Sequence, residues 1–261
     1  ITGIGNVGGS MRKTSAKVQL HVEVVNPEGR TTHAFQVEGD NTDVGIGADL
    51  EPGTLLAGYR GGLFPMPFRK RQVGWWSPDP RMELFSDEFR LKRSLRKTIA
   101  KFIRTPGCEV RIDSAFRRVI EACAGTPREG QDGTWITAQM QQAYIRLHEL
   151  GHAHSVEAWI GGELAGGLYG MAIGRAFYGE SMFSRVSDAS KIALAHLARY
   201  LERRGFAVID CQMKTAHLAS LGAREIRRSE LLRGLDTWTS AEPAPGKWPQ
   251  DGARDLFGNL T

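Results

Sequence analysis

Cysteine is scarce in this chain. Only Cys108, Cys123 and Cys211 occur among the 261 residues, and no C-x-x-C pair is present. An odd, widely spaced set does not build the disulfide framework of a small secreted domain, and it lacks the ligand spacing of a structural zinc site. We therefore expect a cytoplasmic protein with neither disulfides nor a bound metal.

Long apolar runs are also missing. No segment approaches the roughly 20 apolar residues that cross a bilayer, and the first residues lack the apolar core of a signal peptide. Hydrophobic residues make up 41% of the chain and charged residues 24%, which is typical of a globular protein with a sizeable core. We expect no membrane contact, and a disordered or artificial leader over residues 1–10.

The sequence His148-Glu149-Leu150-Gly151-His152 matches the H-E-x-x-H signature of zinc proteases. That signature needs both histidines on one face of a continuous helix. Apolar residues recur at helical spacing before it, but Gly151 stands where a helix-terminating glycine belongs, and strand-like alternation begins at Ser155. We predict that the helix ends before His152 and that the match is accidental.

The order of the expected elements indicates an α+β fold. The patterns predict strands at 18–25, 31–37, near 110, and at 154–160, 163–173, 175–182 and 207–211, and helices at 52–59, 90–104, 114–124, 135–150, 189–204 and 229–235. We expect a small N-terminal α+β domain (11–89, with a rigid aromatic loop at 61–67), a GNAT-like acyltransferase domain with a mixed central sheet (90–236), and a loosely attached tail (237–261).

One loop of ordinary GNAT enzymes is absent. They bind the pyrophosphate of acetyl-CoA through a glycine-rich loop that enters a helix, where exposed backbone N–H groups hold the anion. The equivalent segment here, residues 183–191, reads FSRVSDASK and contains no glycine. The acyl group is therefore expected to come from another donor, although an acyl-CoA-dependent enzyme remains the alternative.

A basic stretch carries no acidic residue between positions 89 and 104. Its apolar residues follow helical spacing, so the charges lie on the outer face. Such a face is either ordinary solvated surface or an attachment site for a phosphate backbone. The candidate residues for contact with a nucleic-acid backbone are Arg90, Lys92, Arg93, Arg96, Lys97 and Lys101.

Several segments resemble the leucyl/phenylalanyl-tRNA–protein transferases. The resemblance runs from about residue 47 to 235 and is carried by GLFPM (62–66), WWSPDPR (75–81), GTWI (133–136), LHELGHAHSVEAW (147–159), GGLYG (166–170), GESMFS (179–184), IDCQ (209–212) and SLGA (220–223). Residues before 45 do not resemble the family's usual start.

The resemblance implies a reaction. Leucine, phenylalanine or sometimes methionine moves from aminoacyl-tRNA to the α-amino group of a protein that begins with Arg or Lys, which marks that protein for degradation by the N-end rule. Aminolysis of an activated ester requires no metal or CoA. The enzyme must align a partly neutral amine and stabilise the tetrahedral oxyanion. A non-catalytic RNA-binding module is a further alternative, and we expect a monomer.

The same resemblance assigns the catalytic residues. Asp210 and Gln212 lie two apart on a predicted strand, so their side chains share a face. By analogy with the family, Asp210 polarises Gln212, whose amide oxygen contacts the attacking amine; the ribose 2′-hydroxyl is an alternative proton carrier. Glu180 is assigned to the acceptor's cationic side chain. Alternatively, it forms an internal salt bridge with Arg185 or Lys191.

The transferred side chain needs an apolar pocket. Phe177 and Met182 would face opposite sides of a regular strand, so the strand must bulge or turn between them if both are to line the pocket, and Gly179 makes this feasible. Outside the family context, such residues are ordinary core. Trp75 and Trp76 are candidates for stacking on the terminal adenosine, with one of them expected to be buried structurally. The candidate substrate-binding residues are Trp75, Trp76, Leu168, Phe177, Met182, Ser184 and Leu197.

Overall fold

The computed structural model describes residues 18–25, 31–39, 43–46, 49–68, 72–126, 134–241, 245–254 and 256–258. The first three segments, which are β1 (Val18–Val25), β2 (Thr31–Gly39) and β3 (Asp43–Ile46), are described by their backbone alone. Both were predicted as strands, and they form an antiparallel pair. The predicted leader over residues 1–10 lies outside the described residues.

A seven-stranded mixed sheet forms the centre of the protein, and it confirms the predicted α+β class. Its spatial order is β12-β6-β11-β10-β9-β8-β7, and the β10–β11 pair is parallel while the other neighbours are antiparallel. The strands are β6 (Arg81–Phe85), β7 (Cys108–Ile112), β8 (Ala153–Ile160), β9 (Glu163–Ile173), β10 (Ala176–Ser184), β11 (Val208–Asp210) and β12 (Arg224–Ile226).

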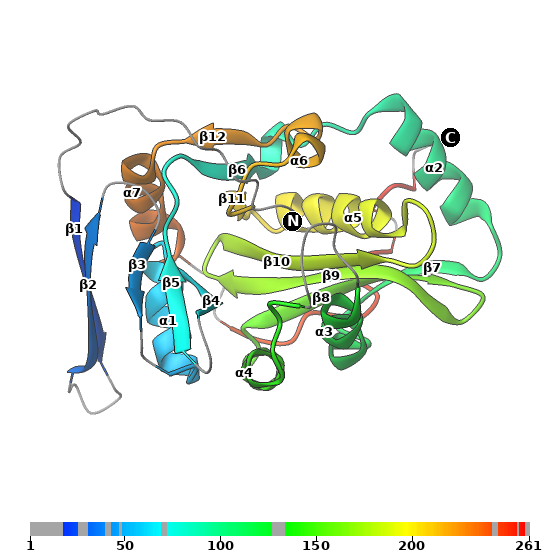
Figure 1. The fold of residues 1–261 in the computed structure, drawn as a ribbon. Coiled ribbons are helices and arrows are strands. Elements are labelled where there is room, and N and C mark those ends of the chain that lie inside the picture. Colours follow the sequence, from blue (N-terminus) through cyan, green and yellow to red (C-terminus); the bar gives the residue numbers. More distant parts are fainter. Residues whose placement is uncertain are drawn as a thin grey trace.

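Helices cover both faces of this sheet (Figure 1). α5 (Ala189–Arg203) packs on one face, and α3 (Phe116–Gly125) and α4 (Ala138–Glu149) pack on the other. α2 (Arg93–Arg104) lies against β7 and α5, and it buries Leu95, Ile99 and Phe102. In the part of the chain that the structure describes, no helix is long and apolar enough to cross a membrane.

The smaller sheet precedes the main one in sequence. It has the order β3-β5-β4, with β4 (Phe64–Phe68) and β5 (Gln72–Trp76) beside α1 (Pro52–Arg60). The sequence predicted a rigid loop at 61–67, and this is wrong in part, because residues from Phe64 onward form β4. The strand accommodates its two prolines because it lies at the edge of the sheet, where a missing N–H donor costs no hydrogen bond to a neighbouring strand.

β6 was not predicted. This strand pairs with β11 on one side and β12 on the other, so the central sheet extends to residues before the boundary that we expected at 89/90. Two short helices, η1 (Ser86–Glu88) and α6 (Ala216–Ser220), and the longer α7 (Arg228–Trp238) complete the described elements.

β10 has two irregularities that open the sheet. β11 pairs with β10 only as far as the Tyr178–Asp210 pair, whereas β10 continues to Ser184. On its other side, Gly179 pairs with Gly170 and Ser181 with Tyr169, so Glu180 is the extra residue of a β-bulge. The predicted bulge is therefore confirmed. Because a bulge changes which side chains share a face, Phe177 and Met182 can point to one side.

α4 ends before the second histidine of the His-Glu-Leu-Gly-His segment. Its last helical residue is Glu149, and Gly151 has a φ of 80°, which favours glycine. The N–H of His152 donates to Leu147 O (2.8 Å) and that of Gly151 to His148 O (2.9 Å), the two bonds of a Schellman motif. The two histidines therefore do not lie one turn apart on a helix. This confirms the prediction that the helix ends before His152.

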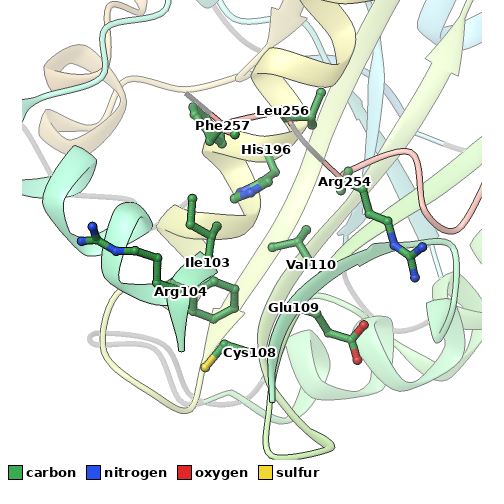
Figure 2. Close-up of a pocket in the computed structure, with 12 residues that line it drawn as sticks. Ile103, Arg104, Cys108, Glu109, Val110, His196, Arg254, Leu256 and Phe257 are labelled. Atoms are coloured by element: carbon green, nitrogen blue, oxygen red, sulfur yellow. The ribbon is translucent and has the colours of Figure 1, made fainter. Parts of the chain in front are cut away.

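The C-terminal tail is attached more firmly than the sequence predicted, and that expectation is corrected. Trp248 stacks on His154 with ring centroids 3.8 Å apart, and Leu256 and Phe257 are buried. As Figure 2 shows, the tail also closes one side of a cavity of about 370 Å³ beside Val110 and His196. The Pro- and Gly-rich composition of the tail predicted loose attachment, because only a few apolar side chains anchor it.

Candidate active site

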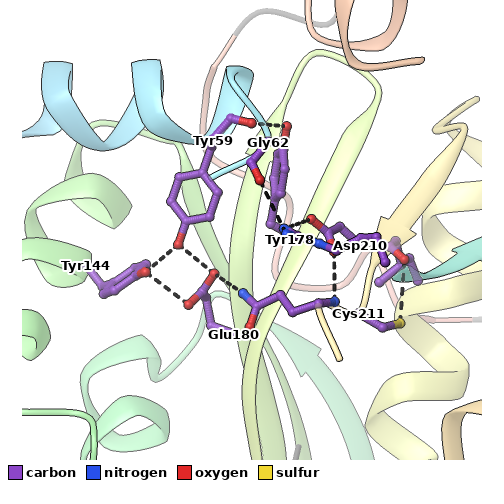
Figure 3. A network of polar contacts seen from close by, with 10 residues as sticks. Tyr59, Gly62, Tyr144, Tyr178, Glu180, Asp210 and Cys211 are labelled. Carbon is purple, nitrogen blue, oxygen red and sulfur yellow. Dashed lines mark hydrogen bonds and ion pairs between the residues drawn. The ribbon is translucent and has the colours of Figure 1, made fainter. Parts of the chain in front are cut away.

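Glu180 stands at the centre of a buried polar network (Figure 3). Its carboxyl group accepts hydrogen bonds from the Tyr59 hydroxyl (2.6 Å), the Tyr144 hydroxyl (2.9 Å) and the Gln212 side-chain amide (3.1 Å). The two tyrosine hydroxyls also contact each other. α1, α4 and the segment after β11 therefore meet at the bulge of β10. The alternative salt bridge is not formed, since Lys191 pairs with Asp188 and Arg185 donates to Leu164 O.

All three donors to Glu180 are neutral. Burial raises the pKa of Glu180 from 4.5 to about 7, and the hydrogen bonds from the two tyrosines oppose that rise. Burial and the neighbouring carboxylate in turn raise the pKa of both tyrosines, which therefore remain proton donors at neutral pH. A buried carboxyl that titrates near pH 7 is characteristic of functional sites.

Asp210 has a cationic partner instead. Arg81 donates to it through Nε (2.9 Å) and through a terminal nitrogen (2.6 Å), and both side chains are inaccessible to solvent. Arg81 also lies over the Phe64 ring, 4.6 Å from its centroid, and donates to Gly62 O at 3.3 Å. This guanidinium therefore joins the aromatic segment 61–67 to the end of β11.

Gln212 is positioned differently from the prediction. β11 ends at Asp210, so the two residues do not share a strand, and Gln212 has a φ of 62°. Asp210 Oδ1 accepts from the backbone N–H of Gln212 (2.8 Å) and holds this left-handed turn. The Gln212 amide nitrogen faces Glu180, which leaves its amide oxygen as the group available to an amine.

A third buried carboxyl lies beside Asp210. Glu83 is opposite Asp210 in the β6–β11 register and is inaccessible to solvent. Within the described residues neither of its carboxyl oxygens has a hydrogen-bond partner. Burial and the Asp210 carboxylate raise the pKa of Glu83 well above its usual value.

An apolar cavity adjoins Glu180. It contains the four expected pocket residues Leu168, Phe177, Met182 and Leu197, and it lies where β10 and β11 separate. Its free volume is about 30 Å³, roughly that of one water molecule. A leucine or phenylalanine side chain therefore needs its walls to move, and the flexible, half-buried Met182 is suited to that movement.

The remaining candidates lie outside this cavity. Ser184 is exposed at the end of β10, where its hydroxyl bonds Val186 O (2.8 Å) and the N–H of Ser190 (3.2 Å). Trp75 is buried against α1: a Cβ at Gly58 would come within 2.3 Å of its ring. Trp75 is thus the structural tryptophan of the pair and offers no face for stacking. Trp76 is half-buried.

The basic surface is as exposed as predicted, although its helix begins later. α2 starts at Arg93, so Arg90 and Lys92 precede it. All six candidate tRNA-binding side chains are exposed: Arg90, Lys92, Arg93, Arg96, Lys97 and Lys101. No group of three or more His, Cys, Asp or Glu side chains suited to a metal ion occurs in the described part of the chain.

Sequence reasoning missed the partners of the site carboxyls. Arg81 ends the quoted WWSPDPR segment and Tyr144 lies in the helix predicted at 135–150, but neither was given a site role. The only sequence signal was indirect, since a buried Glu or Asp requires polar partners. Which partners it has depends on contacts between segments that are 121 residues apart for Tyr59 and 129 for Arg81.

Comparisons with known proteins agree with this architecture. The family profile described as leucyl/phenylalanyl-tRNA protein transferase matches residues 84–236, and the profile of that family's N-terminal domain matches residues 48–79. A protein from Aromatoleum aromaticum named leucyl/phenylalanyl-tRNA–protein transferase is 55% identical over 82% of this chain and 89% of its own. A protein of the same name from Azoarcus is 59% identical over 77% and 84%, respectively.

These matches identify the class of enzyme: the chain is an aminoacyltransferase. It belongs to the leucyl/phenylalanyl-tRNA–protein transferase family. The family resemblance seen in the sequence is thereby confirmed.

Proposed function

We propose that this protein transfers leucine or phenylalanine from its tRNA to the α-amino group of cytoplasmic proteins that begin with Arg or Lys, and so marks them for N-end-rule degradation. One observation carries the proposal: the apolar cavity and the Glu180 network share a wall, because Glu180 itself lines the cavity. An apolar acyl side chain and a cationic acceptor would therefore bind next to each other.

The transferred side chain fits the cavity chemically. Phe177, Met182, Leu168 and Leu197 surround it with hydrocarbon and one thioether. Hydrophobic pockets discriminate by about 1–3 kcal/mol per methylene, so valine and alanine would be poorer guests than leucine. The half-buried Met182 would let the same pocket take a branched or an aromatic guest.

The acceptor's cationic side chain would bind at the carboxyl of Glu180. The present donors to Glu180 are neutral, so an Arg or Lys side chain would supply a cationic partner and would favour the ionised carboxylate. Gln212 would accept a hydrogen bond from the α-amino group through its amide oxygen. An amide takes up no proton at neutral pH, so Gln212 orients the amine without deprotonating it.

The bond changes then balance. The acceptor nitrogen attacks the ester carbonyl, the new C–N bond forms, and the C–O bond to the terminal ribose breaks. One proton passes from the amine to the departing ribose oxygen. Asp210 would act indirectly here, because Arg81 and the Gln212 N–H occupy its carboxylate. Its part is to hold the Gln212 turn in its left-handed conformation.

The test is transfer of labelled leucine from charged tRNA to a peptide that begins with Arg, with the same peptide beginning with Ala and an acetyl-CoA reaction as controls. We expect label in the Arg peptide only. Glu180→Gln should lower kcat/KM for the Arg peptide about ten- to a hundredfold, the loss of one charged hydrogen bond. Acetylation without leucine transfer, or tRNA binding with no transfer, would contradict the proposal.

A further inference from the structure

A more polar cavity lies next to the apolar one, along the same two helices. It has a volume of about 140 Å³ and is enclosed by the start of α2, the start of α5 and α6. Its polar lining includes Lys92, Lys191, His217, Ser94 and Ser220. Leu194 and Leu218, one turn or less from Lys191 and His217, line the apolar cavity. The two cavities are therefore neighbours that share α5 and α6.

The segment that presents Lys92 is fixed in place. The N–H of Arg90 donates to Leu221 O at 2.7 Å, and the backbone at Glu88 presses on Gly222, where a Cβ would come within 2.3 Å of Glu88 O. These contacts hold the start of α2 against the end of α6. The cavity is thus built by packed backbone, and Lys92 enters it from a defined position.

The lining is suited to an anion. Lys92 and Lys191 supply two positive charges, and Asp188 accepts from Lys191 at 2.6 Å. A lysine has three donors, so Lys191 can hold Asp188 and an anion together. Ser94 and Leu95 also line the cavity and belong to the first turn of α2, whose N–H groups have no acceptor within the helix. The helix dipole adds to their attraction for negative charge.

His217 gives an independent sign of a missing ligand. Its Nε2 is buried and has no hydrogen-bond partner among the described residues. A buried polar atom is normally paired, so an unpaired one at the wall of a polar cavity indicates a partner that enters from outside. Burial, and the positive charges of Lys191 and Lys92, lower the pKa of His217. An anion between these groups would act in the opposite direction on this pKa, and the neutral imidazole can already donate an N–H to it from Nε2.

We propose that this cavity binds one phosphate of the single-stranded 3′ end of the donor RNA. The inference rests on the proposed function, since it places a phosphodiester next to the cavity that would take the aminoacyl side chain. The exposed basic face of α2 continues from Lys92 through Arg93, Arg96 and Lys97, and such a track follows a nucleic-acid backbone rather than a free anion. The cavity joins that track to the acyl site.

The experiment measures transfer and binding with the full-length chain. Lys191→Gln and His217→Gln change the cavity, and Arg117→Gln, an exposed residue of α3, is the matched control. Donors are leucyl-tRNAs with a neutral methylphosphonate at one linkage of the 3′ single strand at a time. Uncharged tRNA binding is measured over a range of salt concentrations, and urea unfolding checks that every variant is folded.

We expect both cavity variants to raise KM for the donor about tenfold, the loss of one charged contact, with kcat unchanged and Arg117→Gln unaffected. One methylphosphonate linkage should cost the wild type a similar factor and cost Lys191→Gln nothing further. The salt dependence of tRNA binding by Lys191→Gln should be shallower by about 0.7 in log–log slope.

Two results would overturn the site. One is an unchanged donor KM and salt slope in both folded variants. The other is inhibition by inorganic phosphate while every methylphosphonate donor behaves normally, which would indicate a free-anion site. If the wild type transfers no amino acid at all, the proposed function fails, and the salt slopes with uncharged tRNA still decide the phosphate site.

Discussion

Asp210 and Glu180 are two carboxyl groups of one buried network, and they are stabilised by different kinds of hydrogen-bond donor. Asp210 is paired with the Arg81 guanidinium through two hydrogen bonds, whereas Glu180 receives three bonds from neutral donors. Both are almost completely buried. Two hydrogen bonds from a guanidinium fix the position of Asp210, while burial among neutral donors raises the pKa of Glu180 to about 7, so that this carboxyl can respond to a ligand.

The difference separates architecture from chemistry. Arg81 and Asp210 connect the aromatic segment 61–67, β6 and the turn at Gln212, so they fix positions. Glu180 lies on the wall of the apolar cavity, at the bulge where β10 leaves its regular path. The rigid pair therefore acts as a support, and the titratable group stands where a substrate would arrive.

The largest effect on stability is expected at the Arg81–Asp210 pair. Arg81→Met should lower the free energy of unfolding by about 3–5 kcal/mol, because it leaves the Asp210 carboxylate buried without its cationic partner. Urea unfolding measures this. The control is Lys214→Met, whose partner Glu225 lies in an exposed ion pair, and which should cost less than about 1 kcal/mol.

The double variant Arg81→Met/Asp210→Asn tests the cause of that loss. If an unpaired charge is responsible, removing the charge should recover part of the stability that Arg81→Met loses. Equal losses in the single and double variants would assign the effect to packing against Phe64 and contradict the comparison.

The next effect is the pH dependence of stability that arises from Glu180. The pKa of Glu180 is raised from 4.5 to about 7, so between these values the folded state binds more protons than the unfolded chain. Stability associated with this group is present below about pH 4.5 and is lost as the pH rises towards 7, up to about 3 kcal/mol.

Glu180→Gln should remove this contribution. The quantity to measure is the difference in unfolding free energy between the wild type and Glu180→Gln at a series of pH values, which cancels the other titrating groups. The wild type should lose stability relative to the variant from pH 4.5 to 7 and run parallel to it above pH 8. A constant difference over the whole range would mean that Glu180 keeps an ordinary pKa.

The sequence predicted the parts of this network that depend on local patterns. Hydrophobic periodicity located α4 and α5, alternation located β8, β9 and β10, and Gly179 indicated the bulge. The family resemblance supplied Glu180, Asp210 and Gln212. It could not supply Tyr59, Tyr144 and Arg81 as partners, because these contacts arise from packing between distant segments. Short strands such as β12, and the buried anchors of the tail, also lack a local pattern.

The smallest effect separates the two tyrosine environments. Tyr144 donates to Glu180, whereas Tyr178 donates to the backbone oxygen of Tyr59 at 3.1 Å, and both are fully buried. Either substitution by phenylalanine should cost about 1 kcal/mol of stability through one lost hydrogen bond. Only Tyr144→Phe removes a donor that favours the ionised carboxylate, so only this variant should raise the pKa of Glu180, by up to about one unit.

The measurement compares each phenylalanine variant with its own double variant carrying Glu180→Gln. The pH above which the two stability curves run parallel should move upwards for Tyr144→Phe alone. An equal shift in both variants would mean that general loosening of the network, rather than the hydrogen bond from Tyr144, sets the pKa of Glu180.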